Sequence, residues 1–172
     1  MMKVSEYGAS LFRDLRKRDG LDDELLLDSF SPKMNEDAMF KFQEGSGKSE
    51  CFFYYTENKR FVIKTLKDLE LRRLIKKGLI ENYNAHLKKN PKSLLARIYG
   101  VYKIKVKFMK PISLIIMENI IGSNSQELEG LYDLKGSSFQ RFAQPKTASS
   151  VLKDNNFLLN VNHRLSIGPY LK

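Results

Sequence analysis

The chain has 172 residues, and its 30 lysines and arginines against 20 aspartates and glutamates give a formal net charge of +10. This length allows one domain with a substantial core, and a composition of 42% apolar and 29% charged residues excludes a disordered chain. The longest uninterrupted apolar stretch, Cys51–Tyr55, is far too short for a membrane-spanning helix, which needs about 20 residues. The positive charge indicates an anionic partner: a nucleotide phosphate, a nucleic acid or the cytoplasmic face of a membrane.

Cysteine usage and the amino-terminal segment indicate a cytoplasmic protein. The first residues, MMKVSEYGAS, lack the apolar stretch of a secretory signal. The single cysteine, Cys51, cannot form an internal disulfide, and the chain has only two histidines to accompany it in a metal site. We therefore expect a reducing compartment and no His/Cys metal centre.

Leucines at near-helical spacing predict that the first thirty residues are helical, with a break at Asp19-Gly20. The pattern then changes, and Ala38–Gln43 partly alternates apolar and polar residues, as a half-buried strand does. A loop of small residues, Glu44–Ser49, follows. The leucines that carry the helical pattern are Leu11, Leu15, Leu21, Leu25 and Leu26.

The central part of the chain predicts a β-hairpin followed by a long helix. Cys51–Tyr55 and Arg60–Leu66 are strand-like and are separated by a short polar turn. Over Asp68–Lys89 apolar residues recur mostly at steps of three and four, which predicts one helix with a bend at Gly78. Together the elements predict an α/β fold of the α+β kind, in which helices flank an antiparallel sheet. The remaining extended segments are predicted at Leu94–Val106, Ile112–Met117 and Leu131–Gly136.

Lys64 is the first candidate for chemistry. Alternation along its strand places it on one face with Val62 and Leu66. An ammonium group on an apolar face needs an anionic partner, because an unpaired buried charge is very costly. A nucleotide phosphate beneath the glycine loop would be such a partner, as in protein kinases. The alternative, which the local pattern by itself favours, is a lysine whose stem packs while its ammonium group reaches water.

The glycine loop contains the sequence GKS, which invites comparison with the P-loop of nucleotide-binding proteins. That motif requires a further glycine where this chain has Phe42, and a helix after the loop where this chain has an aromatic strand. The P-loop interpretation therefore fails, and a phosphate-covering flap and a plain hairpin loop remain as alternatives. The loop residues are Gly45, Ser46, Gly47, Lys48 and Ser49.

Other charged residues are weaker candidates. Glu70 or Glu81 on the predicted helix could pair with Lys64, although a solvated surface carboxylate is the favoured interpretation of each. Asp133 and Lys135 are two residues apart, so they share a face in a strand. A carboxylate beside an ammonium group suits a magnesium-phosphate group. The alternative is an exposed ion pair, which contributes at most about 1 kcal/mol.

Taken together, these segments resemble the phosphatidylinositol phosphate kinases, which are lipid kinases that use ATP. The run YDLKGSS at Tyr132–Ser138 is similar to the signature of that family, and Ser46–Leu66 resembles its glycine-loop hairpin and ATP-lysine strand. The resemblance covers nearly the whole chain. It extends to FRDLRKRDGLDDELLLDSF at 12–30, HLKKNPKSLLARIYGVYKIKV at 86–106 and LKDNNF at 152–157.

This resemblance implies the N-terminal lobe of a kinase-like lipid kinase fold, with ATP and Mg²⁺ as cofactors. Lys64 would bind the ATP phosphates beneath a flap formed by Gly45–Ser49, and Val62 would be among the ATP-binding residues. Met117, Glu118 and Asn119 would lie at the hinge beside adenine, and Asp133 and Lys135 would support the nucleotide-magnesium site.

The family also carries a later Met-Asp-Tyr-Ser-Leu segment with its catalytic aspartate, an Ile-Asp motif that binds magnesium, and a loop that selects the lipid. None of these occurs before Lys172. We therefore expect residues 1–172 to be the N-terminal half of the catalytic domain, with no catalytic residue and no metal ligand of its own.

The expected reaction is transfer of the γ-phosphate of ATP to an inositol-ring hydroxyl of a phosphatidylinositol phosphate, with phosphatidylinositol 4-phosphate as the favoured substrate. The alternative is a non-catalytic basic module that docks on an anionic membrane or a partner. A nucleic-acid partner is not expected, because CFFYY is typical of a packed strand and an RNP1 pattern is missing. We also expect a phosphoinositide substrate and peripheral contact with an anionic membrane surface. A homodimer is compatible with the sequence.

Overall fold

The structure, a computed structural model, describes residues 1–36, 52–76, 78–122, 128–147 and 150–160. The chain divides into two compact units, Met1–Ser123 and Asn124–Lys172, and each is described by itself. The strand predicted at Ala38–Gln43 and the loop Gly45–Ser49 lie outside the described residues.

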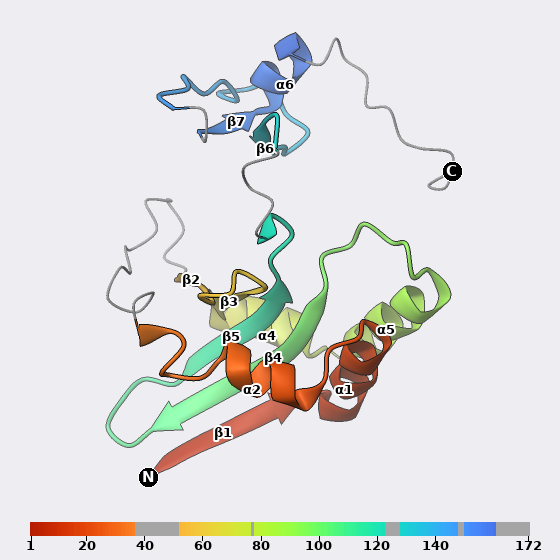
Figure 1. The fold of residues 1–172 in the computed structure, drawn as a ribbon, viewed down its shortest axis with the longest axis vertical. Coiled ribbons are helices and arrows are strands. Elements are labelled where there is room, and N and C mark those ends of the chain that lie inside the picture. Colours follow the sequence, from red (N-terminus) through yellow and green to blue (C-terminus); the bar gives the residue numbers. More distant parts are fainter. Residues whose placement is uncertain (37–51, 77, 123–127, 148–149, 161–172) are drawn as a thin grey trace. The chain divides into compact units, whose positions relative to one another are not determined.

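The first unit is built on a five-stranded antiparallel sheet, which confirms the predicted α+β fold (Figure 1). The predicted hairpin is present, since β2 pairs with β3 and Tyr55 lies opposite Val62. On its other side β3 pairs with β5, so that Lys64 lies opposite Ile115. In spatial order the strands are β1 (Met2–Tyr7), β4 (Ile98–Val106), β5 (Ile112–Glu118), β3 (Phe61–Leu66) and β2 (Phe53–Tyr55).

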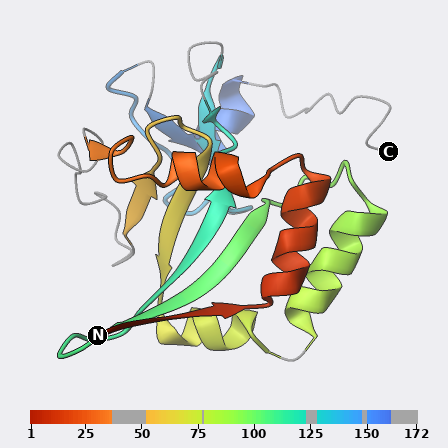
Figure 2. The same cartoon turned by 60° about the horizontal axis from the view of Figure 1, so that its bottom comes forward.

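Among the described residues, four helices accompany this sheet. Helix α1 (Ala9–Arg18) lies beside α5 (Leu79–Lys89), as Figure 2 shows. Helix α2 (Asp23–Ser29) begins at Asp22, whose carboxylate accepts a hydrogen bond from the Leu25 amide at 2.7 Å and so caps the helix. Helix α4 (Asp68–Leu74) follows β3 directly and packs against it.

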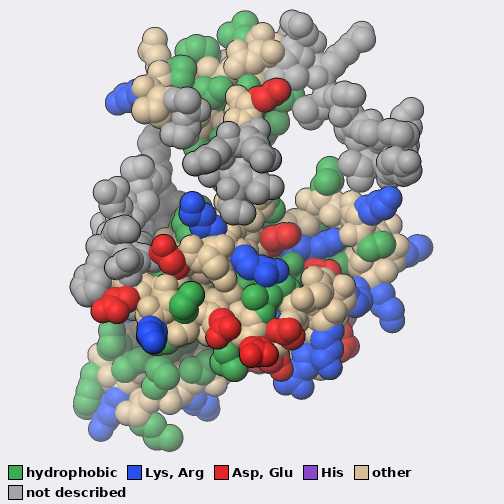
Figure 3. Space-filling model, viewed as in Figure 1, with side chains coloured by type: hydrophobic (Ala, Val, Ile, Leu, Met, Phe, Trp, Pro, Cys, Tyr) green, Lys and Arg blue, Asp and Glu red, His purple; other side chains and the backbone are tan. Residues whose placement is uncertain are grey.

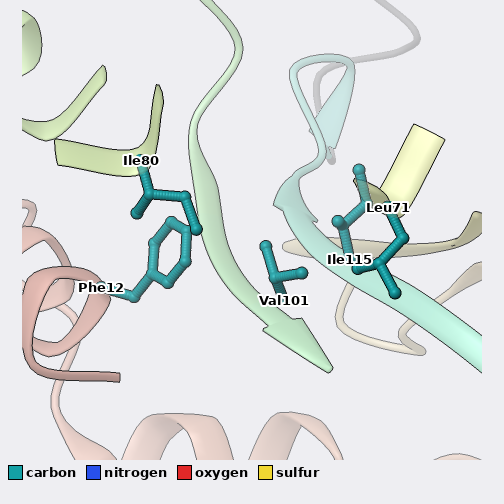
Figure 4. Packing of buried hydrophobic residues seen from close by; sticks show 5 residues of the cluster. All are labelled: Phe12, Leu71, Ile80, Val101 and Ile115. Atoms are coloured by element: carbon teal, nitrogen blue, oxygen red, sulfur yellow. The ribbon is translucent and has the colours of Figure 1, made fainter. Parts of the chain in front are cut away.

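Two groups of buried side chains join the helices to the sheet. The first brings Phe12 of α1 and Leu71 of α4 onto the central strands, with Val101 fully buried (Figure 4). The second packs Leu15 of α1 near Phe61, whose ring meets that of Tyr99 edge to face at 5.9 Å. Their full memberships are Phe12, Leu71, Ile80, Val101 and Ile115 in the first, and Leu15, Leu21, Phe61, Leu87 and Tyr99 in the second.

The structure corrects three predictions for the first unit. The first thirty residues are not all helical, because Met2–Tyr7 is the edge strand β1, paired with β4. The single helix predicted over Asp68–Lys89 is two helices. Gly78 separates α4 from α5 and has a φ of 88°, a left-handed conformation that a helix cannot continue through. The predicted strand Leu94–Val106 begins only at Ile98.

In the part of the second unit that the structure describes, there is a small parallel sheet and one helix. Strand β6 (Leu131–Asp133) lies within the predicted extended segment 131–136 and pairs with β7 (Val151–Lys153). Helix α6 (Asp154–Asn160) follows β7 without a gap. The ring of Phe157 on α6 meets that of Tyr132 on β6 edge to face at 5.4 Å, which fastens the helix to the sheet.

The conformation of Gly78 gives a stability prediction. Replacement by alanine should lower the free energy of unfolding by about 1–2 kcal/mol, because a Cβ disfavours the left-handed conformation. Apart from the adjacent residues of the chain, no described atom lies closer than 3.9 Å to the position that a Cβ would occupy, so the cost is one of backbone conformation. Gly78→Asn, which tolerates this conformation better, should lose less. Urea unfolding of both variants measures the difference, and a stabilised Gly78→Ala would show that one helix runs through this point.

Candidate functional site

Lys64 and Glu70 form an ion pair at the junction of β3 and α4. The Lys64 ammonium nitrogen lies 3.2 Å from Oε1 of Glu70, and the lysine side chain is 26% exposed. The other carboxylate oxygen of Glu70 accepts a hydrogen bond from the Lys67 amide at 2.8 Å, which closes the first turn of α4. Glu70 is therefore not the solvated surface carboxylate that the sequence alone led us to expect. Glu81 lies on α5 and lines a groove between α1 and α5.

The charge of Glu70 is stabilised by this arrangement. The pKa of its carboxyl lies below the usual value, first because the Lys67 amide donates a hydrogen bond to it. Partial burial opposes this shift, and the hydrogen bond and charge of Lys64 add to it. Glu70 is consequently ionised at neutral pH and holds the Lys64 side chain by one of its oxygens.

The face of the sheet that carries Lys64 is partly open and apolar. The register places Tyr55, Val62 and Met117 in one row across three strands, with Phe53 and Lys64 paired in the next row. Phe53 and Tyr55 are exposed, the latter by 50%, whereas Val62 and Met117 are half-buried. A cation beside an open apolar surface suits a ligand that combines a flat ring with negative charge.

The residues predicted at the hinge lie at the end of β5. Two of them, Glu118 and Asn119, donate hydrogen bonds to backbone carbonyls of neighbouring segments. The Glu118 amide donates to the carbonyl of Arg97 at 2.9 Å. The Asn119 amide donates to the carbonyl of Arg60 at 2.9 Å, and its side-chain Nδ2 donates to the carbonyl of Lys59 at the same distance. Asn119 therefore ties the end of β5 to the turn between β2 and β3.

Asp133 and Lys135 in the second unit also form an ion pair, with 2.9 Å between the ammonium nitrogen and Oδ1. Arg141, which the sequence did not suggest, lies 3.4 Å from the other oxygen of Asp133 and donates to its backbone carbonyl. The pKa of Asp133 is lowered, first by the hydrogen bond from Lys135 and then by Arg141, while partial burial opposes both. Asp133 and Lys135 remain largely accessible.

Asp154 organises the backbone beside this pair. Its Oδ1 accepts hydrogen bonds from the amides of Lys135 at 2.9 Å and Gly136 at 2.8 Å, and its Oδ2 accepts one from Nε of Arg141 at 2.7 Å. These contacts, that of Arg141 first, hold the pKa of Asp154 well below its usual range. The side chain is largely buried, so its role is to fix the loop after β6.

Sequence reasoning missed the roles of Arg141 and Asp154. The only indication in the sequence was that Asp154 lies in the segment LKDNNF, which resembles the kinase family. Asn156 lies in the same segment and has a similar role. Asn156 accepts hydrogen bonds from the amides of Lys153 and Ala143 and donates to the carbonyl of Ala143 at 2.9 Å. The segment therefore holds two loops: Asp154 binds the loop before Arg141, and Asn156 binds the loop after it.

Among the described residues, no group of three or more histidine, cysteine, aspartate or glutamate side chains could hold a metal ion. No helix in the same part of the chain is long and apolar enough to cross a membrane.

Comparison with known proteins gives one family in every match described below. The family model described as Phosphatidylinositol-4-phosphate 5-Kinase matches residues 34–172. A phosphatidylinositol 4-phosphate 5-kinase of Schizosaccharomyces pombe is 30% identical over 171 residues, which cover 97% of this chain and 22% of the relative. A phosphatidylinositol 4-phosphate 5-kinase-like protein of Mus musculus is 35% identical over 168 residues, 91% of this chain and 41% of the relative.

A third relative, the type-1 alpha phosphatidylinositol 4-phosphate 5-kinase of Rattus norvegicus, is 34% identical over 119 residues, 67% of this chain and 21% of the relative. The chain thus spans less than half the length of each of these three relatives.

The loop held by Asp154 should respond to acid. The pKa of Asp154 is depressed in the folded chain, so its stabilising contribution is complete above the unfolded value of about 3.9 and is lost as pH falls toward the folded value. Asp154→Asn should therefore reduce the amide-exchange protection of Lys135 and Gly136 at pH 7, and the difference from wild type should shrink as pH falls below about 4.

Amide exchange followed by NMR measures this effect, with Asp23→Asn on α2 as the control that leaves these two amides unchanged. Equal protection in wild type and Asp154→Asn at pH 7 would contradict the role of Asp154.

Proposed function

The chain belongs to the phosphatidylinositol-4-phosphate 5-kinase family, and from this membership we propose that it is the nucleotide-binding part of an ATP-dependent lipid kinase. In the proposed reaction the γ-phosphate of ATP passes to an inositol-ring hydroxyl of a phosphatidylinositol phosphate, with phosphatidylinositol 4-phosphate as the substrate. Because the chain spans only part of its relatives, this activity is proposed for the protein that contains it.

The observation that carries the proposal is the Lys64–Glu70 pair on the open face of the sheet. Catalysis of phosphoryl transfer depends mainly on positioning and on electrostatic stabilisation of the phosphates. Glu70 uses one oxygen for Lys64 and the other for the Lys67 amide, so the ammonium group is held while part of the lysine side chain stays accessible. It would bind the ATP phosphates from this position.

The apolar surface around Lys64 would hold the adenine ring. Tyr55 is exposed, and Val62 and Met117 share its row on the same face of the sheet. Ligand sites typically combine apolar contact area with a few placed polar groups. We assign Glu118 and Asn119 to the hinge beside adenine, where Asn119 acts by holding the backbone, and Gly45–Ser49 to the covering flap.

Asp133 and Lys135 are proposed to support the nucleotide with its Mg²⁺. Both side chains are accessible, and Asp133 is ionised at neutral pH because its pKa is lowered. Mg²⁺ usually takes one or two carboxylates together with phosphate oxygens and water, so one ionised carboxylate fits an auxiliary role. The metal would screen the phosphate charge during transfer, and the Arg141 contact would keep Asp133 in place.

The assignment of Lys64 predicts a large catalytic effect. In the full-length kinase, Lys64→Ala should lower kcat/KM for ATP by about a hundredfold or more, because one preorganised charge contact to the reacting phosphates is lost. Steady-state kinetics with a short-chain soluble phosphoinositide measure the effect without membrane binding.

A matched control is Lys103→Ala, since Lys103 lies on β4 and shares the face of Lys64 through the register of β4, β5 and β3. This control should stay within about twofold of wild type, as surface substitutions usually do. A Lys64→Ala enzyme as active as the Lys103→Ala enzyme would refute the assignment.

A further inference from the structure

One end of the five-stranded sheet carries an exposed apolar surface. The register places Met2 opposite Val106, Val4 opposite Ile104, and Ile104 opposite Ile112, so these residues share one face across β1, β4 and β5. All but Ile104 are exposed. Figure 3 shows hydrophobic side chains gathered at the lower left, over the same strand ends that Figure 1 draws there.

The turn between β4 and β5 extends this surface. Phe108 is 95% exposed and Met109 is 61% exposed, so neither side chain belongs to the hydrophobic core. Phe108 also has a φ of 65°, a left-handed conformation that glycine or asparagine adopts far more readily than an aromatic residue. A phenylalanine here has no structural advantage, which points to a binding role.

Lysines carry the charge of the β4–β5 turn and of the strand segments beside it, whereas the acidic Glu6 on β1 accepts a hydrogen bond from the Tyr102 hydroxyl. From Val101 to Met117 the chain contains four lysines and no acidic residue. Lys3 lies opposite Lys105 across β1 and β4, and the Lys107 ammonium nitrogen lies 4.9 Å from the centre of the Phe108 ring. The four lysines are Lys103, Lys105, Lys107 and Lys110.

We propose that the turn 106–111, with the adjoining ends of β1, β4 and β5, inserts into the headgroup region of an anionic lipid bilayer. Exposed apolar residues flanked by lysines are the combination that interfacial membrane binding requires, because the apolar groups enter the acyl boundary while the lysines contact lipid phosphates. A second copy of this chain fits less well, since it would bring the same lysines together.

The inference deepens the proposed function, because a lipid kinase has to reach a headgroup at a membrane surface. It assigns that contact to the end of the sheet formed by the β4–β5 turn. Lys64 lies on a different strand, β3, so membrane binding and nucleotide binding can be lost separately.

Insertion of the turn can be observed directly. The chain has no tryptophan, so Phe108→Trp introduces a single indole at the tip. Its fluorescence should shift to the blue on vesicles of phosphatidylcholine with 30% phosphatidylserine, and brominated acyl chains should quench it. Leu94→Trp, at an exposed site before β4, is the matched control and should show neither effect.

Affinity tests the same contact. Phe108→Asn with Met109→Ser keeps a residue suited to the turn and should weaken binding to these vesicles by about tenfold or more. Lys107→Glu with Lys110→Glu should weaken it by at least about fivefold for each lysine and flatten its dependence on salt. Leu94→Ser with Leu95→Ser removes exposed apolar side chains elsewhere and should leave binding unchanged.

Each outcome decides the proposal. Wild-type affinity in the Phe108→Asn/Met109→Ser variant, or an unshifted indole in Phe108→Trp, would overturn it. A concentration-dependent dimer that this variant dissociates, with vesicle binding intact, would show instead that the surface joins two copies. The variant should retain ATP binding while Lys64→Ala retains vesicle binding, so failure of the membrane inference is distinguished from failure of the kinase assignment.

Discussion

The proposed nucleotide site of the first unit depends on the ion pair between Lys64 and Glu70. An ammonium group on a partly buried face of a sheet is tolerated only when a charge or a strong acceptor satisfies it. Glu70 provides that charge from the first turn of α4, where its second oxygen also closes the helix start. The position of α4 against β3 and the orientation of the cation are therefore set by one carboxylate. Because Glu70 binds the ammonium group through a single oxygen, and Lys64 is not fully buried, the cation can contact a phosphate as well.

A second carboxylate acts in the same way in the second unit, but on backbone. Asp154 gathers the amides of Lys135 and Gly136 and the side chain of Arg141, and Arg141 in turn contacts Asp133. The accessible pair of Asp133 and Lys135 is thus supported by the largely buried pair of Arg141 and Asp154. In both units an accessible charge is held by a carboxylate that is itself fixed by backbone hydrogen bonds, which is the arrangement that a preorganised site needs.

The parts of this fold that were predictable from the sequence are those set by local pattern. Alternation of apolar and polar residues and a polar turn predict the hairpin of β2 and β3 and strand β5. They also place Val62, Lys64 and Leu66 on one face of the sheet.

The parts that were missed depend on contacts far apart in the chain. Strand β1 exists because it pairs with β4, about a hundred residues away. The bend predicted at Gly78 is a full break, and the two helices pack separately, α4 against β3 and α5 against α1. Glu70 is only six residues from Lys64 and was one of the two partners considered, but the sequence could not decide between the ion pair and a solvated carboxylate, because the turn from β3 into α4 determines where the Glu70 side chain lies. Arg141 and Asp154 escaped notice because their partners lie in loops whose path no periodicity describes.

The central claim is that Glu70 positions Lys64 for the phosphates of ATP, and a double-mutant cycle on ATP affinity in the full-length kinase tests it most directly. The account predicts that Lys64→Ala and Glu70→Gln each weaken ATP binding, and that the double variant is no weaker than Lys64→Ala alone, which is a coupling of about 1 kcal/mol or more. Glutamine keeps an oxygen for the Lys67 amide, so the start of α4 is preserved while the charge is removed. Additive effects of the two substitutions, or unchanged ATP affinity in Glu70→Gln, would contradict the claim.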